Sequence, residues 1–161
     1  MLRACVITCS DAASSGHRED RSGLAVRELM RANGYDVGAG VIVPDDVERI
    51  VGAIDEAIAE GARLVVTTGG TGIAPRDVTP EATLRVCDRL IPGFGELMRA
   101  RSLEKTPMAP LSRAQAATRG DVLVINLPGS PRGAVENLQA VLHLIPHTLE
   151  LLTGRRVDRH P

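Results

Sequence analysis

Short, uninterrupted apolar runs alternate along the chain with longer segments in which apolar residues recur every three or four positions. Runs at residues 2–8, 64–66 and 122–125 have the length and composition of strands buried on both faces. Residues 37–43, which contain two glycines and stop at Pro44, indicate a further strand. The pattern therefore predicts four strands, each followed by a helical segment.

The clearest helical segment places five apolar residues at i, i+3, i+4, i+7 and i+11, a single amphipathic stripe of Val47, Ile50, Val51, Ile54 and Ile58. Other helices are expected from about residue 20 to 33, 79 to about 89, 96 to 103, and 130 to 154 with a break at Pro146. We expect Thr79 to cap its helix through its hydroxyl, and Ser130 to cap the last one. Residues 106–120 indicate no clear element.

Alternation of buried strands and helices predicts an α/β protein with helices on both faces of a mostly parallel sheet. We expect one domain over residues 1–154 and a loose C-terminal tail over residues 155–161. In such folds ligands bind beyond the carboxyl ends of the strands. Four polar or glycine-rich segments follow the strands and should share that edge: residues 10–11, 44–46, 69–77 and 128–132.

The amino-acid composition argues against several classes of function. The 161 residues carry a net charge of −1, which gives no general attraction to nucleic acid or anionic membrane. Phe94 and Tyr35 are the only aromatic residues, too few for stacking on single-stranded nucleic acid. No apolar run has membrane-spanning length. The three cysteines are an odd set without a bridging pattern, which favours a reducing cytoplasm.

Asp45 and Asp77 are the candidate catalytic acids, since each follows a predicted strand. Two carboxylates at one edge could hold Mg²⁺, which bridges phosphate oxygens and takes few protein ligands. The alternative is helix capping, because both lie close to a predicted helix start. Asp46 suits the cap of its helix better than Asp45, which leaves Asp45 freer for chemistry.

Two loops could bind anions through backbone N–H groups. One comprises Gly69, Gly70, Thr71 and Gly72, and the other comprises Pro128, Gly129 and Ser130. Ordinary turn chemistry explains either loop alone. Two such loops at one edge would suit a ligand with two phosphate-bearing ends.

Other candidates carry less information. Ser10 and Asp11 end the first strand and are compatible with a plain polar loop. The basic side chains near the loops could neutralise phosphate, and one or two are expected to matter, among Arg76, Lys105, Arg113 and Arg132. His143 and His147 are better explained as helix residues than as zinc ligands.

Several motifs, taken in order, resemble the molybdopterin adenylyltransferases of the MogA/MoaB type. They are Thr-Thr-Gly-Gly-Thr-Gly at 67–72, Arg-Asp-Val-Thr-Pro-Glu-Ala at 76–82, Pro-Gly-Phe-Gly-Glu-Leu-Met-Arg at 92–99, Leu-Ser-Arg at 111–113 and Asn-Leu-Pro-Gly-Ser-Pro at 126–131. The resemblance spans nearly the whole chain. It implies a three-layer α/β/α molybdopterin-binding fold and a homo-oligomer, a trimer or possibly a hexamer.

The resemblance also implies an activity: transfer of AMP from Mg·ATP to the terminal phosphate of molybdopterin, with release of pyrophosphate. Asp45 and Asp77 fall on the family's essential aspartates, and Ser10 and Asp11 fall on its Ser-Asp pair. Ala12 departs from the arginine that commonly follows this pair. Two other functions stay open, a catalytically silent molybdopterin-binding or carrier protein and a signalling or scaffold module of the same fold.

Overall fold

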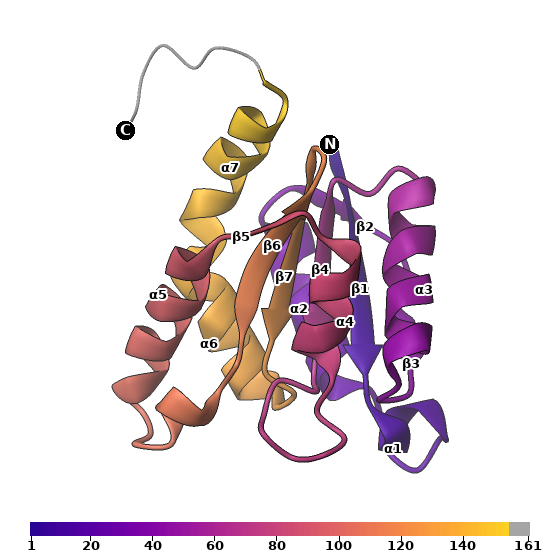
Figure 1. Ribbon diagram of the computed structural model, residues 1–161, viewed down its shortest axis with the longest axis vertical. Coiled ribbons are helices and arrows are strands. Elements are labelled where there is room, and N and C mark those ends of the chain that lie inside the picture. Colours follow the sequence, from indigo (N-terminus) through magenta and orange to yellow (C-terminus); the bar gives the residue numbers. More distant parts are fainter. Residues whose placement is uncertain (155–161) are drawn as a thin grey trace.

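In the computed structural model, which describes residues 1–154, a seven-stranded sheet lies between two layers of helices (Figure 1). The expected α/β/α fold with a mostly parallel sheet is confirmed. The tail expected at residues 155–161 lies outside the described residues. No helix within residues 1–154 combines the length and apolarity needed to span a membrane.

The sheet has the order β2-β1-β4-β7-β6-β5, and β3 pairs with β1 beyond the end of β2. The strands are β1 (Leu2–Cys9), β2 (Tyr35–Val37), β3 (Val41–Val43), β4 (Leu64–Thr68), β5 (Arg89–Leu90), β6 (Gln115–Arg119) and β7 (Val122–Leu127). Strands β2, β3 and β4 run parallel to β1, and β7 runs parallel to β4. Strand β6 is antiparallel to both β7 and β5.

Two apolar clusters fix the helices to the sheet. One cluster joins the sheet to α2, α5, α6 and α7 on one face, and the other joins it to α3 and α4 on the opposite face. The α-helices are α1 (Asp11–Ser14), α2 (Arg21–Ala32), α3 (Val47–Ala59), α4 (Thr79–Val86), α5 (Pro92–Leu103), α6 (Pro131–Val141) and α7 (Ile145–Leu152), and the 3₁₀ turns are η1 (Ala109–Leu111) and η2 (Leu142–Leu144). Both faces of the central strands are therefore covered, which explains their uninterrupted apolar runs.

Three helix starts follow the sequence prediction. The side chains of Asp20, Asp46 and Ser130 cap α2, α3 and α6, each accepting a hydrogen bond from a backbone N–H in the first turn. Such caps satisfy amide donors that have no partner inside the helix. Since Asp46 takes this role, Asp45 is left free of it, as expected.

Thr79 does not cap α4, contrary to the prediction. The cap position belongs to Val78, and the Thr79 hydroxyl instead donates to the carbonyl oxygen of Gly69 at 2.9 Å. The local signal was a hydroxyl followed by Pro80, but a buried acceptor in another loop competes for that hydroxyl. Thr79 therefore ties the glycine-rich loop to the helix that follows it.

Several element boundaries also differ from the prediction. The strand expected at 37–43 is two short strands separated at residues 38–40. Helix α5 begins at Pro92 rather than Glu96, and the last helical segment is interrupted at Leu142–Leu144, ahead of Pro146. Residues 106–120 contain η1 and β6, and the alanines of β6 are poor strand formers that gave no signal.

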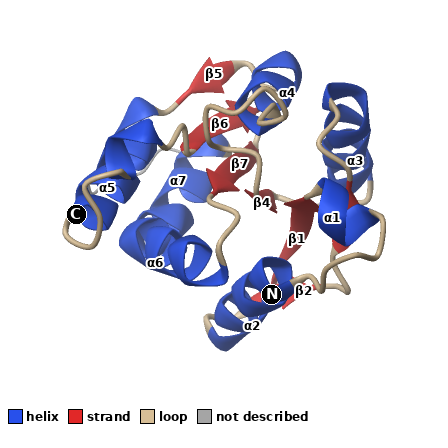
Figure 2. Cartoon of the chain, turned by 90° about the horizontal axis from the view of Figure 1, so that it is seen from below, coloured by secondary structure: helices blue, strands red, loops and turns tan. Residues whose placement is uncertain are grey.

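The carboxyl ends of β1, β3, β4 and β7 lie at one edge of the sheet, which faces the viewer in Figure 2. The register sets these ends level: Thr8 pairs with Thr68, and Thr68 pairs with Leu127. All four polar segments that follow these strands are therefore brought together at this edge, as the sequence predicts.

Candidate active site

A cavity of about 500 Å³ opens at this edge of the sheet, and we call it the strand-end cavity. Loops after β1, β3, β4 and β7 all contribute to it. Its lining is Thr8, Cys9, Ser10, Ala13, Arg18, Glu19, Asp20, Arg21, Ser22, Asp45, Thr68, Gly69, Gly70, Asp77, Gly129, Ser130 and Pro131. Of the predicted site residues, Ser10, Asp45, Gly69, Gly70, Asp77, Gly129 and Ser130 line this cavity directly.

Asp11 and Asp45 exchange hydrogen bonds between two loops. The backbone N–H of Asp11 donates to Asp45 Oδ2, and the backbone N–H of Asp45 donates to Asp11 Oδ1, each at 3.0 Å. Asp11 also accepts two hydrogen bonds of 2.9 Å from the guanidinium of Arg76. Three of the predicted residues thus form one connected network across the loops after β1, β3 and β4.

The two acids of this network have opposite pKa shifts. The backbone N–H of Asp45 and the guanidinium of Arg76 hold the pKa of Asp11 below its usual value. Burial raises the pKa of Asp45, and the nearby charges of Asp11 and Asp77 raise it further. Asp45 is therefore an acid whose charge would be stabilised by a cation.

The environment of Asp45 fits a bound Mg²⁺. Its Oδ1 is buried and has no hydrogen-bond partner among residues 1–154, so one carboxylate oxygen remains available to a cation. Asp77 lines the same cavity, and its Oδ2 accepts from the backbone N–H of Ala74 at 2.9 Å. Residues 1–154 contain no cluster of three or more metal-binding side chains. Mg²⁺ takes one or two protein carboxylates and fills its other positions with phosphate and water, so Asp45 and Asp77 are the residues that could hold it.

The glycine-rich loop passes too close to its neighbours for side chains. Gly70 has φ +65°, and a Cβ there would collide with the Thr79 hydroxyl and lie 3.3 Å from Asp45 Oδ1. A Cβ on Gly129 would lie 3.2 Å from the Cα of Gly69, so the two predicted anion-binding loops touch through glycine. The loops form one continuous wall of backbone next to the acids.

Arg113 holds the glycine-rich loop in place. Its backbone N–H donates to the carbonyl oxygen of Thr71 at 2.7 Å, and its side chain donates to those of Gly72 and Asp77 at 2.8 and 2.7 Å. It also pairs with Glu81. These contacts join residues about 40 positions apart in the sequence, so the local sequence pattern does not predict them. Arg113, a candidate phosphate cation from sequence, instead has its donors engaged by the protein.

A second cavity of about 440 Å³ lies on the other side of the loop between β7 and α6. Pro128 and Ser130 line it together with residues of α5, η1 and α6, including Ser102, Ala109 and Asn137. The candidate cations Lys105 and Arg132 also line it, and both face Glu136, at 3.9 and 3.0 Å. Ser130 is shared by the two cavities, so they meet at this loop.

Asp20, Thr8, Ser22 and Thr68 also line the strand-end cavity, although the sequence pattern predicts only a helix start near Asp20. Its Oδ1 accepts from the Thr8 hydroxyl at 2.8 Å and from the N–H of Gly23 at 2.9 Å. Ser22 and Thr68 are hydrogen bonded to each other at 2.9 Å. In the sequence, the position of Asp20 at the end of a polar loop is the one signal that it could line the cavity.

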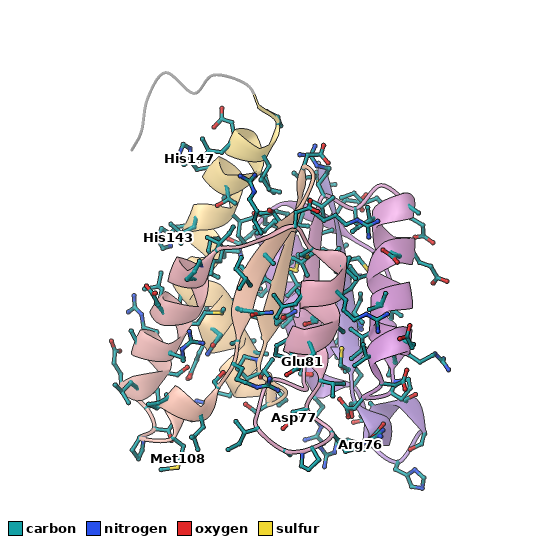
Figure 3. All side chains as sticks on the ribbon, in the orientation of Figure 1. Arg76, Asp77, Glu81, Met108, His143 and His147 are labelled. Carbon is teal, nitrogen blue, oxygen red and sulfur yellow. The ribbon has the colours of Figure 1, made fainter. Side chains whose placement is uncertain are left out.

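The histidines, Cys9, Thr71 and Gly72 are the remaining candidates from sequence. Figure 3 shows His143 and His147 on the C-terminal helical segment, away from Arg76 and Asp77, which lie near the bottom of the view. Cys9 borders the strand-end cavity, but burial raises the pKa of its thiol to about 12, so it is not a nucleophile at neutral pH. Thr71 is buried, and Gly72 lies against Asp77, so both support the loop from within it.

Comparison with known proteins matches this geometry to one family. The family model described as "Probable molybdopterin binding domain" matches residues 5–147. A relative named molybdopterin adenylyltransferase from Helicobacter pylori is 44% identical over 92% of this chain and 86% of its own length.

Solved structures agree with the sequence match. The molybdopterin biosynthesis enzyme MoaB from Thermus thermophilus is 49% identical, with a TM-score of 0.88 over 96% of this chain and 98% of that one. The tungsten cofactor synthesizing protein MoaB from Pyrococcus furiosus is 38% identical, with a TM-score of 0.86 over 94% and 97% of the two chains. The chain therefore belongs to the molybdopterin-binding family of molybdenum cofactor biosynthesis, as its motifs predicted.

Proposed function

We propose that this protein is a molybdopterin adenylyltransferase, which transfers AMP from ATP to the terminal phosphate of molybdopterin and releases pyrophosphate. The observation that carries the proposal is the pair of cavities that meet at Ser130 beside Asp45 and Asp77. A reaction that joins two phosphate-bearing molecules needs two binding regions with a common boundary. The naming of the relatives supports the same reaction.

The proposed reaction does not need a strong side-chain base. An oxygen of the molybdopterin phosphate attacks the α-phosphorus of ATP, and the bond from that phosphorus to the bridging oxygen breaks. Pyrophosphate leaves with the bonding electron pair. Because the attacking phosphate is already an anion, catalysis depends on positioning and on neutralisation of charge.

Different residues of the strand-end cavity would position the phosphates and neutralise their charge. Asp45 and Asp77 would hold Mg²⁺, which would supply charge neutralisation at the reacting phosphates. The buried Oδ1 of Asp45 supports its part in this site. Asp11 orients Asp45 through their exchanged hydrogen bonds, and Arg76 neutralises Asp11. Backbone N–H groups of residues 69–72 and 128–130 would bind phosphate oxygens where the two loops meet.

Calorimetry combined with a pyrophosphate assay distinguishes an adenylyltransferase from a catalytically silent carrier. The purified protein is titrated with molybdopterin, and pyrophosphate is then measured after addition of Mg·ATP. An enzyme binds molybdopterin and releases pyrophosphate, whereas a carrier binds molybdopterin without ATP turnover. A protein that binds neither molybdopterin nor ATP would leave the scaffold function as the alternative.

We also propose a cytoplasmic homo-oligomer, a trimer or possibly a hexamer. Cys5, Cys9 and Cys87 are free thiols, which suits a reducing compartment. Exposed large apolar side chains, such as Ile73 at 67% exposure and Met108 at 62%, offer surface for contacts between copies. Sedimentation equilibrium tests this, and a monomer at micromolar concentration would exclude it.

A further inference from the structure

The strand-end cavity is rich in acidic side chains for a site that is proposed to take a nucleoside triphosphate. Glu19, Asp20, Asp45 and Asp77 line it, while Arg18 and Arg21 are its basic lining residues. One Mg²⁺ held by Asp45 and Asp77 would offset part of this charge. A polyphosphate would still need a protein cation that is not already neutralised.

Most nearby cations are engaged by the protein itself. Arg76 pairs with Asp11, Arg113 pairs with Glu81, and Arg21 lies 3.7 Å from Glu19. Arg27, on the first turns of α2, lies 3.6 Å from Asp20. Within residues 1–154, these pairs leave little guanidinium charge for a ligand.

Arg18 differs from these arginines. Its side chain makes no hydrogen bond and no ion pair with the described residues, although it lines the strand-end cavity. It is exposed, so it lies at the mouth of the cavity rather than at the floor formed by Thr8 and Thr68. An exposed, unpaired guanidinium keeps its donors available for an incoming anion.

The loop that carries Arg18 is held at both ends. On one side, the N–H of His17 donates to the carbonyl oxygen of Ala12 at 2.9 Å, which ties the loop to α1. On the other side, the buried carboxylate of Asp20 receives hydrogen bonds from Thr8 and Gly23. Arg18 therefore lies between two fixed points, which limits the entropy lost when its side chain binds a ligand.

We infer that Arg18 binds the pyrophosphate half of ATP, the β- and γ-phosphates that leave in the reaction. This inference rests on the proposed function. Asp45 and Asp77 lie beside the glycine-rich loop, where the reacting α-phosphate would be held, so the terminal phosphates extend toward the mouth. A planar guanidinium binds two phosphate oxygens at once, and a solvent-exposed position leaves a path for pyrophosphate to depart.

Calorimetry with Mg·ATP and with AMP tests the inference, because AMP lacks the phosphates that Arg18 would contact. We expect Arg18→Ala to weaken Mg·ATP binding about 10-fold, the size of one charge-assisted hydrogen bond, and to leave AMP binding unchanged. Arg18→Lys should recover part of the loss. Arg49→Ala is the matched control, since Arg49 is exposed on α3 outside the cavity and its side chain has no ion pair with any residue of 1–154.

The outcomes separate the inference from the proposed function. If the wild type binds Mg·ATP and Arg18→Ala binds it equally well, the inference is overturned and the proposed function stands. Equal weakening of AMP and Mg·ATP would also overturn it, because the effect would then be structural. If the wild type binds no Mg·ATP, the proposed function fails and the inference fails with it.

Discussion

Asp11 and Asp45 are locked together by two hydrogen bonds of 3.0 Å, each from the backbone N–H of one residue to the carboxylate of the other. The pair joins the loop after β1 to the loop after β3, across 34 positions of sequence. It orients Asp45 so that Oδ2 accepts a hydrogen bond inside the protein, while Oδ1 has no partner in the described part of the chain. We propose that this oxygen binds Mg²⁺ and that Asp11 positions Asp45 for it.

Substitution of Asp11 tests this positioning. Asp11→Ala removes the acceptor for the Asp45 N–H and frees the orientation of the loop, so we expect adenylyl transfer to slow roughly 10–100-fold, as for other residues that orient a metal ligand. Arg76→Ala keeps both exchanged hydrogen bonds and should slow the reaction less. Steady-state rates at saturating substrates compare the two variants. Equal losses in both would assign the effect to the charge of Arg76 instead.

Asp45 should cost the protein stability at neutral pH. Burial raises its pKa in the folded state above the unfolded value, so its favourable contribution is present below the unfolded pKa and is lost as the pH rises through the folded pKa. The Asp45→Asn side chain does not ionise, so this variant does not lose stability as the pH rises. We expect this variant to unfold at a higher denaturant concentration than the wild type at pH 7 in magnesium-free buffer, and the difference to shrink toward about pH 4.

Asp46→Asn is the control for this measurement. It removes the same charge from the neighbouring residue, and asparagine caps a helix as well as aspartate does. Its unfolding midpoint should stay close to that of the wild type at both pH values. A pH-independent difference between Asp45→Asn and the wild type would contradict the assigned pKa shift.

Gly70 should tolerate no side chain, for reasons beyond its backbone angle. Gly70 and Gly34 both have positive φ, at +65° and +86°, which costs alanine about 1–2 kcal/mol at either position. A Cβ at Gly34 would meet nothing within 4 Å, whereas at Gly70 it would displace Thr79 or Asp45. Gly70→Ala should therefore lose more stability than Gly34→Ala, and also lose activity. Thermal unfolding measures the stability of the two variants, and the pyrophosphate assay measures their activity. Equal losses in the two variants would show that a Cβ at Gly70 is not crowded by Thr79 and Asp45.

The Thr79 hydroxyl should be required to hold the glycine-rich loop. It is fully buried and donates to the carbonyl oxygen of Gly69. Thr79→Val keeps the shape but leaves that carbonyl oxygen unpaired, so we expect a loss of about 1–3 kcal/mol in the free energy of unfolding. Thr79→Ser keeps the hydroxyl and should preserve most of the stability. If serine destabilises the protein as much as valine does, then keeping the hydroxyl does not keep the stability, and the hydrogen bond to Gly69 is not what holds the loop.

The fold was largely predictable because its signals are local. The apolar run at 64–66 is uninterrupted since β4 is covered on both faces, and Asp46 and Ser130 cap helices within three residues of themselves. Strand β6 was missed because its buried alanines resemble no strand pattern. Its place is set by pairing with β7, which is not visible in a local window.

The site was predictable only as far as its residues follow strand ends. That rule brought Asp45, Asp77 and the two glycine loops to one edge before any geometry was known. It could not show the exchange between Asp11 and Asp45, the hold of Arg113 on the glycine-rich loop, or the wall that Arg18 and Asp20 form. Each of these depends on contacts between distant segments, and the prediction that Thr79 caps α4 was wrong for the same reason.

Adenylyl transfer by Asp45 and Asp77 can be measured under single-turnover conditions. The protein is mixed with molybdopterin and Mg·ATP, and adenylyl-molybdopterin and pyrophosphate are both quantified. We expect the wild type to form the two products in equal amounts, and Asp45→Asn and Asp77→Asn to form neither at a comparable rate while remaining folded. Unchanged rates in both variants, or a wild type that binds molybdopterin and ATP without forming either product, would contradict it.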